Sequence, residues 1–304
     1  MAGVRPSVSV CIPAYNHAEL LGPTIESVLG QSLQDFEIIV ADDCSADGTA
    51  AVASGFADPR IRVVRNVRTL GAASNWNQVV RMAKGSFIKL LCDDDLLYPN
   101  CLARQASVLA EARNQDVELV CCQRDIIDAR GTRLFTRSGF RRVTGRLPGN
   151  VAVRRIVRSG TNLVGEPTAT MFRATALEAV GGFDEELSYM IDLDFWCRLL
   201  ARGALYVIPE ALCTFRVSEE GWSTRIGSFQ ASQARRFFRD LRIGRTTSVS
   251  PLDVLAGCTR ATILAVMRQL LYEALRLRRA MKPTQRSPSR PSTIQPKAVK
   301  GKRY

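Results

Sequence analysis

Three consecutive carboxylates, Asp93, Asp94 and Asp95, follow an apolar run that begins at Phe87. Adjacent carboxylates repel one another, so the folded chain must compensate them with a cation or with several hydrogen-bond donors. Carboxylate oxygens are hard ligands of the kind that Mg²⁺ and Mn²⁺ prefer. The alternative is a helix N-terminus near Pro99, where acidic residues that oppose the helix dipole contribute about 0.3–1 kcal/mol each. The triplet therefore indicates a divalent-metal site or a helix start.

A second acidic pair, Asp42 and Asp43, ends another apolar run, and the segment 45–49 that follows is rich in capping residues. This is the composition of an ordinary strand-to-helix turn. A buried acidic pair at a strand end is also a suitable acceptor for the donor edge of a base or for ribose hydroxyls. Tyr15 and Asn16, after the first apolar run, add a ring that can stack and an amide that can pair. On these residues alone, both interpretations stay open.

The composition restricts the acid–base chemistry. His17 is the only histidine in the sequence, which removes histidine metal triads, Ser-His-Asp catalysis and a histidine general base unless His17 itself takes part. Acid–base catalysis must then fall to carboxylates. Nine cysteines occur without a CxxC pair, several of them inside apolar runs, which favours reduced core residues in a cytoplasmic protein over a zinc site.

The chain of 304 residues is 46% hydrophobic and 23% charged, which is typical of a globular protein. Its formal net charge of +13 is local, because ten Lys or Arg and no acid lie beyond Ala274. Nine more Arg without an acid lie between Ala129 and Arg158. Localised positive charge favours phosphate-bearing acceptors, anionic membrane surfaces or nucleic acid. Nucleic acid is the least expected, because the tail lacks interleaved aromatic residues.

Short β-branched runs alternate with helical patterns over the first 120 residues. This alternation predicts an α/β fold with a mainly parallel, Rossmann-like sheet flanked by helices, and ligands at the carboxyl ends of the strands. Residues 13–16, 42–45 and 93–95 should then converge on one edge. The expected strands are 7–12, 36–41, 61–65, 87–91, 117–122, 168–172 and 206–208, and the expected helices are 17–29, 47–56, 72–83, 101–112, 151–158, 192–201, 230–241 and 251–280, with a hairpin or loop over 129–148.

Five motifs stand out along the chain. They are residues 7–16, residues 36–45, the spacing of Gly71, Asn77 and Gly85, residues 90–95 with Pro99, and residues 181–185 followed by 192–198. Together they resemble the signatures of the family 2-type inverting glycosyltransferases, which have the GT-A fold. The resemblance covers roughly residues 7 to 217. It implies that the chain transfers a sugar from a nucleotide diphosphate sugar to a hydroxyl of a glycan, lipid-linked or polypeptide acceptor, in cell-surface polysaccharide or glycoconjugate biosynthesis.

The resemblance also implies roles for individual residues. Asp192 is expected to be the catalytic base, and Asp94 the ligand of Mg²⁺ or Mn²⁺ with Asp95 in support. The residues expected at the nucleotide sugar are Pro13, Tyr15, Asn16, Asp43, Asn77, Asp93 and Arg216, and those expected on the acceptor side are Glu166, Asp194 and Trp196.

The chemistry is consistent with these roles. A divalent ion that bridges the two donor phosphates neutralises the charge that grows on the leaving diphosphate. An opposed carboxylate that deprotonates the acceptor hydroxyl permits direct displacement with inversion. On position alone, Asp192 could equally be the N-cap of its helix. Asp194 lies about 200° further around that helix, so it is expected to support rather than to share a target. Glu166 could line the acceptor pocket or be a surface acid before a proline turn.

Three residues depart from the family pattern. Trp76 replaces a frequent arginine, Cys92 replaces the first acid of the metal segment, and Ser218 replaces a histidine near the diphosphate. Metal binding is therefore expected to depend more on Asp94. Arg225, on an expected mobile loop, is a second candidate beside Arg216 for the diphosphate.

The expected organisation is a transferase domain over 1–217, with a donor half to residue 122 and an acceptor half after it. A helical extension over 218–281 and a disordered basic tail over 282–304 follow. The helix 251–280 is a packing or dimer helix, or it docks on anionic lipid. Since no signal peptide or membrane-spanning run is visible, a cytoplasmic or peripheral membrane protein is expected. The competing functions are a sugar nucleotidyltransferase and a degenerate glycan- or membrane-binding scaffold.

Overall fold

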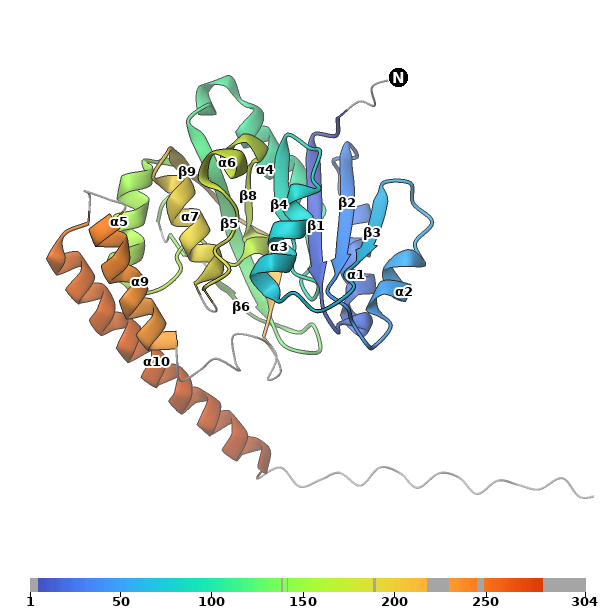
Figure 1. Cartoon of the computed structure of the whole chain (residues 1–304). Coiled ribbons are helices and arrows are strands. Elements are labelled where there is room, and N and C mark those ends of the chain that lie inside the picture. Colours follow the sequence, from blue (N-terminus) through green and yellow to red (C-terminus); the bar gives the residue numbers. More distant parts are fainter. Residues whose placement is uncertain are drawn as a thin grey trace, which may run out of the picture. The chain divides into compact units, whose positions relative to one another are not determined.

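A nine-stranded sheet organises the described part of the chain, in the order β3-β2-β1-β4-β8-β5-β9-β7 with β6 paired to β5 (Figure 1). The computed structural model describes residues 5–137, 139–140, 142–187, 190–217, 230–244 and 249–280, and only the backbone of 230–231, 242–244 and 268–280. The chain divides into two units, Met1–Ala265 and Val266–Tyr304. Ser218, Arg225, their expected mobile loop and the basic tail 282–304 lie outside the described residues. The expected domain boundaries remain predictions.

The strands are β1 (Val8–Ala14), β2 (Phe36–Asp42), β3 (Ile61–Arg65), β4 (Phe87–Leu90), β5 (Val117–Ile127), β6 (Arg133–Arg137), β7 (Gly145–Leu147), β8 (Thr170–Arg173) and β9 (Ala204–Arg216). The helices are α1 (Ala18–Leu29), α2 (Thr49–Ser54), α3 (Ala72–Arg81), α4 (Cys101–Ala110), α5 (Gly149–Ser159), α6 (Ala174–Val180), α7 (Ile191–Leu200), α9 (Gln230–Gly244) and α10 (Pro251–Ala280), with short 3-10 turns η1 (Ala112–Asn114) and η2 (Pro167–Ala169).

The strand directions bring the chemistry to one edge. Strands β3, β2, β1 and β4 are parallel, and β8 is antiparallel to both of its neighbours, β4 and β5. Strand β5 therefore runs in the same direction as β4, and β9 is parallel to β5. The carboxyl ends of β1, β2, β4, β5 and β9 all face the same edge of the sheet. The predicted α/β fold with a mainly parallel sheet is confirmed.

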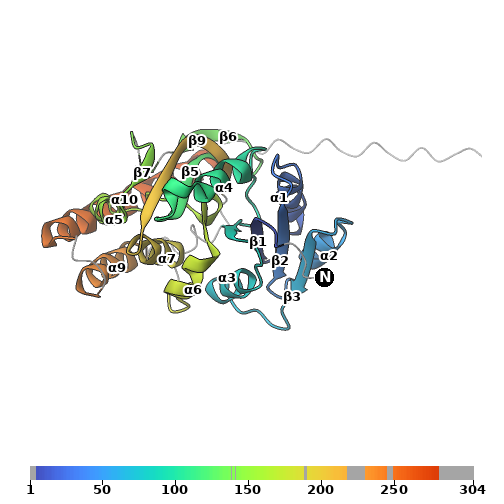
Figure 2. The same cartoon turned by 90° about the horizontal axis from the view of Figure 1, so that it is seen from above.

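Helices cover both faces of the sheet, as the view from above shows (Figure 2). The alternation of side chains along β1 divides the core: Val8, Val10 and Ile12 pack with α1, α2 and α4, whereas Cys11 packs on the side of α3 and α7. All four residues are fully buried. Since burying a Val, Leu or Ile side chain contributes about 1.5–3 kcal/mol, these alternating runs fix the register of the strands and the side on which each helix lies.

Two strands are longer than their apolar runs predict. Strand β9 was expected over 206–208 and spans 13 residues, and β5 continues beyond Cys122 to Ile127. In the added part of β5 lie Arg124 and Asp125, whose side chains are buried although they are charged. Charged residues interrupt an apolar run, so the run that predicts β5 ends before the part of the strand that contributes to the site.

Asn77 on α3 holds the turn that leads towards α7. Its Nδ2 donates to the carbonyl oxygen of Phe183 at 2.8 Å and to Glu185 Oε1 at 3.0 Å, and its Oδ1 accepts from the Phe183 N–H at 2.7 Å. Gly182 makes this approach possible, because a Cβ there would lie 2.1 Å from Asn77 Oδ1. The structure thus corrects the expected nucleotide-sugar contact of Asn77: both ends of its buried amide are engaged within the protein.

We predict that Asn77→Ala lowers the free energy of unfolding by about 1–3 kcal/mol, because it leaves the buried N–H and C=O of Phe183 without partners. Urea denaturation with an unchanged m-value measures the loss. Ser74→Ala is the matched control, since Ser74 on the same helix donates a partly exposed hydrogen bond to Glu185 and should cost less than about 0.5 kcal/mol. Equal losses in the two variants would contradict the role of the buried amide.

Candidate functional site

Asp93, directly after β4, is held by two groups from the segment that follows β1. Its Oδ2 accepts the N–H of Tyr15 at 2.9 Å, and its Oδ1 lies 2.8 Å from His17 Nδ1. The hydrogen bond to Asp93 raises the pKa of His17 to about 9, so the imidazole is protonated at neutral pH. The sequence marked His17 only as the single histidine, and the structure makes it a cation of the site.

Asp94 is the partly exposed carboxylate of the triplet, whereas Asp93 and Asp95 are buried. Burial, followed by repulsion from Asp93, raises the pKa of Asp94 to about 6, against the attraction of His17 and Arg216. Its backbone oxygen accepts from Arg216 Nε at 2.8 Å, so the guanidinium lies beside the triplet. A cation at this carboxylate would relieve both the burial cost and the repulsion.

Asp95 is fully buried and holds the site together. Its Oδ2 accepts from Thr168 Oγ1 at 2.7 Å and its Oδ1 from the Arg216 N–H at 2.8 Å, so it joins β4 to η2 and to β9. Both oxygens are engaged within the protein, which agrees with the supporting role expected of Asp95 beside the metal ligand. The helix-start alternative does not account for the triplet either, because α4 begins at Cys101 after an N-cap at Asn100.

Asp43, after β2, shapes a loop at the same edge. Its carboxylate accepts hydrogen bonds from Asn66 Nδ2 at 2.8 Å and from the N–H groups of Leu70 at 2.8 Å and Gly71 at 2.9 Å. These bonds fix the chain between β3 and α3. Asp42 is the turn residue of the pair, since its carboxylate accepts the N–H of Ser45 at 3.2 Å. The contact of Asp43 with a nucleotide base stays a prediction.

The segment after β1 leaves one aromatic ring open to solvent. Pro13 is buried in the strand, whereas the side chain of Tyr15 is 48% exposed. Asn16 adopts a positive φ of 53°, and its Oδ1 accepts the N–H of Ala46 at 2.9 Å. Asn16 thus holds the turn, and Tyr15 is the residue of this segment whose ring can stack on a planar ligand.

Asp192 lies in the first turn of α7 with a partly exposed side chain. Asn162 Nδ2 donates to its Oδ2 at 2.9 Å, and its Oδ1 accepts the N–H of Leu193 at 2.8 Å. Burial, with the negative charge of Glu166 as the next cause, raises the pKa of Asp192 to about 7. The helix N-cap is Met190, so the capping alternative is wrong. Asn162, which sequence reasoning missed, orients this carboxylate.

Glu166 forms an ion pair with Arg124, whose side chain is only 1% exposed. Burial alone would raise the pKa of Glu166, but the charges of Arg124 and Arg137 outweigh it and lower that pKa. The ionised Glu166 raises the pKa of both Asp95 and Asp192, so it links the triplet to α7. The alternative of a simple surface acid is therefore wrong. Sequence reasoning missed Arg124, because it lies within a run of buried strand residues.

Two expected acceptor-side residues on α7 support the core. Asp194 is buried and accepts from Arg198 Nε at 2.7 Å, which agrees with the supporting role inferred from its spacing. Trp196 is fully buried among Phe172, Phe183 and Phe195, with ring centroids 5.5–6.4 Å away. The structure thus corrects the expected acceptor contact of Trp196, because no part of its side chain is accessible.

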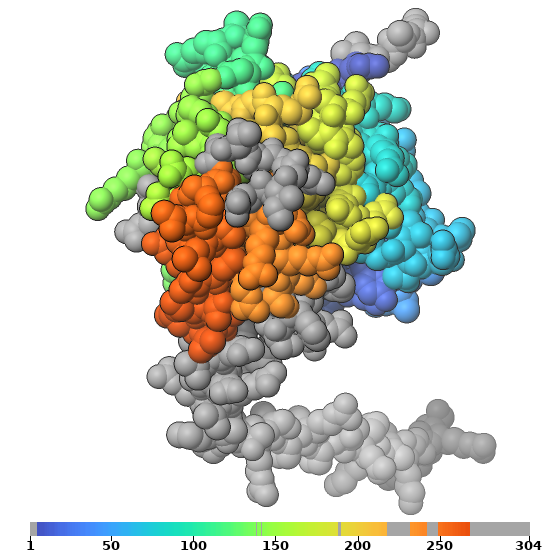
Figure 3. Space-filling model, turned by 60° about the vertical axis from the view of Figure 1, so that its left-hand side comes forward, coloured from blue at the N-terminus to red at the C-terminus, as the bar shows by residue number. Residues whose placement is uncertain are grey.

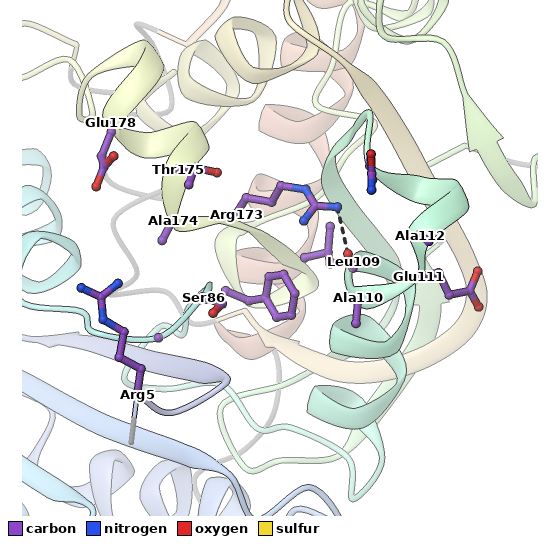
Figure 4. A pocket seen from close by; sticks show the side chains of 13 residues that line it. Arg5, Ser86, Leu109, Ala110, Glu111, Ala112, Arg173, Ala174, Thr175 and Glu178 are labelled. Carbon is purple, nitrogen blue, oxygen red and sulfur yellow. Dashed lines mark hydrogen bonds between the residues drawn. The ribbon is translucent and has the colours of Figure 1, made fainter. Parts of the chain in front are cut away.

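A cavity of about 500 Å³ lies at the opposite edge of the sheet, where β4 begins at Phe87 (Figure 4). Arg173 lines it, but its guanidinium already donates to three backbone oxygens, those of Val117, Leu109 and Asn114, at 2.8–3.0 Å. Arg173 therefore serves the fold. The candidate site is at the carboxyl edge.

The donor set at the carboxyl edge suits a divalent cation that is bound together with a phosphate ligand. Among the described residues, no group of three or more His, Cys, Asp or Glu side chains is arranged to hold a metal by itself. Mg²⁺ is usually bound by one or two carboxylates, with substrate phosphates and waters as its other ligands. Asp94 is suitably placed for this, because its carboxylate is partly exposed, and burial and repulsion from Asp93 raise its pKa.

Sequence comparison gives the family. The sequence model described as glycosyl transferase family 2 matches residues 9–181. An uncharacterized protein of Mycobacterium tuberculosis (strain CDC 1551 / Oshkosh) is 33% identical over 230 residues, which cover 73% of this chain and 70% of that protein. The succinoglycan biosynthesis protein ExoO of Rhizobium meliloti (strain 1021) is 31% identical over 140 residues, 45% of this chain and 39% of ExoO.

Solved structures share the fold at low sequence identity. TarS of S. aureus in complex with UDP-GlcNAc matches with a TM-score of 0.63 and 18% identity over 79% of this chain and 67% of that chain. The mannosyltransferase PcManGT from Pyrobaculum calidifontis, in complex with GDP-Man and Mn²⁺, matches with a TM-score of 0.58 and 20% identity over 92% of this chain and 76% of that chain.

Proposed function

Because the chain belongs to glycosyl transferase family 2 and has the GT-A fold of these enzymes, we propose that it is a metal-dependent, inverting glycosyltransferase. Its donor is a nucleotide diphosphate sugar, and its acceptor is a hydroxyl of a glycan, lipid-linked or polypeptide molecule. One observation carries the proposal: a partly exposed carboxylate, Asp192, has a pKa of about 7 and is linked through Glu166 to the acidic triplet after β4. The site thus pairs a base with a donor-binding edge.

The donor side of the site is formed by the segments that follow β1 and β4. The exposed ring of Tyr15 stacks on the base, and Asp93, oriented by Tyr15 N–H and His17, accepts from the ribose hydroxyls. Asp94 would hold Mg²⁺ or Mn²⁺, which when bound supplies positive charge to the leaving diphosphate. Protonated His17 and the Arg216 guanidinium add positive charge at the same edge.

Asp192 is the general base of the transfer. Its carboxylate takes the proton of the acceptor hydroxyl while the hydroxyl oxygen attacks the anomeric carbon and the bond to the diphosphate oxygen breaks. The attack comes from the face opposite the leaving group, so the configuration at that carbon inverts. A base with a pKa near the working pH is suited to this task, and Asn162 aims the oxygen that accepts the proton.

The comparisons support the substrate class. The structures of similar fold include a complex with UDP-GlcNAc and a complex with GDP-Man and Mn²⁺. The name of ExoO places that relative in polysaccharide biosynthesis, which supports a related role for this chain. Nothing in the described site singles out one base or one sugar, because stacking on Tyr15 and hydrogen bonds to Asp93 are available to UDP, GDP and dTDP donors alike.

We predict that Asp192→Asn lowers kcat at least about 10³-fold and leaves donor binding unchanged, because the amide cannot accept the acceptor proton. A thermal-shift screen of nucleotide sugars with Mn²⁺ identifies the donor first, and turnover and calorimetric binding are then measured with it. Asp35→Asn, at the amino edge of the sheet, is the matched control and should keep full activity. If Asp192→Asn turns over at the native rate, Asp192 is not the general base. If the unaltered chain binds the donor but transfers sugar to none of a panel of acceptors, the scaffold alternative is favoured.

We predict that Asp94→Asn weakens Mn²⁺ binding at least about tenfold in the presence of a nucleoside diphosphate, because one anionic ligand is lost. Electron paramagnetic resonance of free Mn²⁺ measures the binding without any turnover. Asp95→Asn should bind Mn²⁺ as the unaltered chain does but unfold more easily, because Asp95 accepts hydrogen bonds from Thr168 and Arg216. If instead Asp95→Asn weakens Mn²⁺ binding and Asp94→Asn does not, the metal ligand is Asp95 and not Asp94.

We predict that kcat/KM rises with pH through an apparent pKa near 7, because the base acts as the ionised carboxylate and Asp192 ionises there. Asn162 stabilises this ionised form by donating to it, so Asn162→Ala should raise the apparent pKa by about one unit. Thr161→Ala is the neighbouring control and should leave the profile unchanged. If Asn162→Ala lowers kcat/KM at every pH without changing the apparent pKa, Asn162 affects only folding.

A further inference from the structure

Helix α10 presents a row of exposed apolar side chains. Leu252, Leu255 and Ile263 are 75%, 64% and 52% exposed. The steps of three and eight residues between them match the helical repeat, so these positions share one side of the helix. Figure 3 shows α9 and the first half of α10 at the surface of the molecule. We call the three residues Leu252, Leu255 and Ile263 the α10 stripe.

The other side of α10 packs on α5 and α9. Val254 and Ala261 are buried, and Gly257 lies so close to α5 that a Cβ would be 2.0 Å from the Val157 oxygen. Cys258 Sγ lies 3.9 Å from the Arg235 oxygen of α9. The helix therefore already has an apolar packing face, and the α10 stripe is a second apolar face that the described structure leaves in solvent.

Exposed positive charge lies on α10 itself and on its neighbour α5. Helix α5, which packs against α10, carries exposed Arg154, Arg155 and Arg158, and Arg260 of α10 donates to the Arg158 oxygen at 2.7 Å. Among the described side chains of α5 and α10, Asp253 is the one acid, and it is buried and paired with Arg154 and Arg158. An apolar stripe flanked by arginines fits a partner that is both apolar and negatively charged.

We propose that the outer side of α10 docks on the surface of a lipid bilayer that contains anionic phospholipid. The stripe enters the boundary between headgroups and acyl chains, and the arginines of α5 and α10 meet lipid phosphates. A second copy of the chain is a poorer partner, because it would bring a surface of the same positive charge. None of the described helices has the length and apolar character of a membrane span. The proposal does not depend on the reaction proposed above.

Co-sedimentation of the full chain with vesicles tests the proposal. Vesicles of phosphatidylcholine with 30% phosphatidylglycerol should bind the chain, and pure phosphatidylcholine should bind it at least about tenfold more weakly. Leu255→Glu and Ile263→Glu should each lower binding to the anionic vesicles at least about tenfold, since each removes an apolar side chain and adds repulsion. Val67→Glu is the matched control, because Val67 is 98% exposed on a loop distant in sequence from α10.

The electrostatic part has its own variant. Arg155→Glu reverses an exposed charge on α5 and should lower binding to anionic vesicles about fivefold or more while leaving binding to phosphatidylcholine unchanged. Unchanged far-UV circular dichroism shows that each variant is folded. The proposal is overturned if the chain does not bind anionic vesicles, or if Val67→Glu weakens binding as much as Leu255→Glu does. It is also overturned if the stripe variants instead dissociate a dimer detected by light scattering.

Discussion

Mutual repulsion among carboxylates is the constraint on which the structure depends. Strand directions bring Asp43, Asp93, Asp94 and Asp95 to one edge of the sheet, and Asp192 is linked to that edge through Glu166. A cluster of this kind destabilises the fold unless each charge finds a donor or a cation. Most long-range polar contacts near the site meet this need: Tyr15 with His17 for Asp93, Thr168 with Arg216 for Asp95, and the loop 66–71 for Asp43.

The carboxylates differ in how fully hydrogen bonds compensate their charge, and this difference separates structural carboxylates from those available for chemistry. Asp43 and Asp95 are buried and use both carboxylate oxygens within the protein. Asp94 and Asp192 remain partly exposed, with pKa values raised to about 6 and about 7. Carboxylates whose charge is only partly compensated are the ones that can take a metal ion or a proton. Asp43 and Asp95 therefore build the site, whereas Asp94 and Asp192 are the carboxylates proposed to act in the reaction.

The fold was predictable because its signals are local. The apolar runs of β1, β2 and β4 and the amphipathic pattern of α10 are sufficient to place these elements within two residues at either end. The site was only partly predictable. The motif residues are placed at the right edge, but Asn162, Arg124 and the pairing of His17 with Asp93 are contacts between residues 30 to 76 positions apart. Asn77 and Trp196 show the reverse: the motifs predicted ligand contacts for them, whereas in the structure their side chains contact other parts of the protein.

The buried ion pair of Arg124 and Glu166 contributes to the different pKa values of the carboxylates of the site. Replacing a buried ion pair by apolar residues is often neutral or stabilising, so stability alone gives little reason for this pair. Its electrostatic effect gives a better one, because Glu166 raises the pKa of Asp192 and Arg124 lowers it. Burial is the largest cause of the raised pKa of Asp192, and the two charges of the pair act on that pKa in opposite directions. The pair therefore adjusts a pKa that burial has already raised.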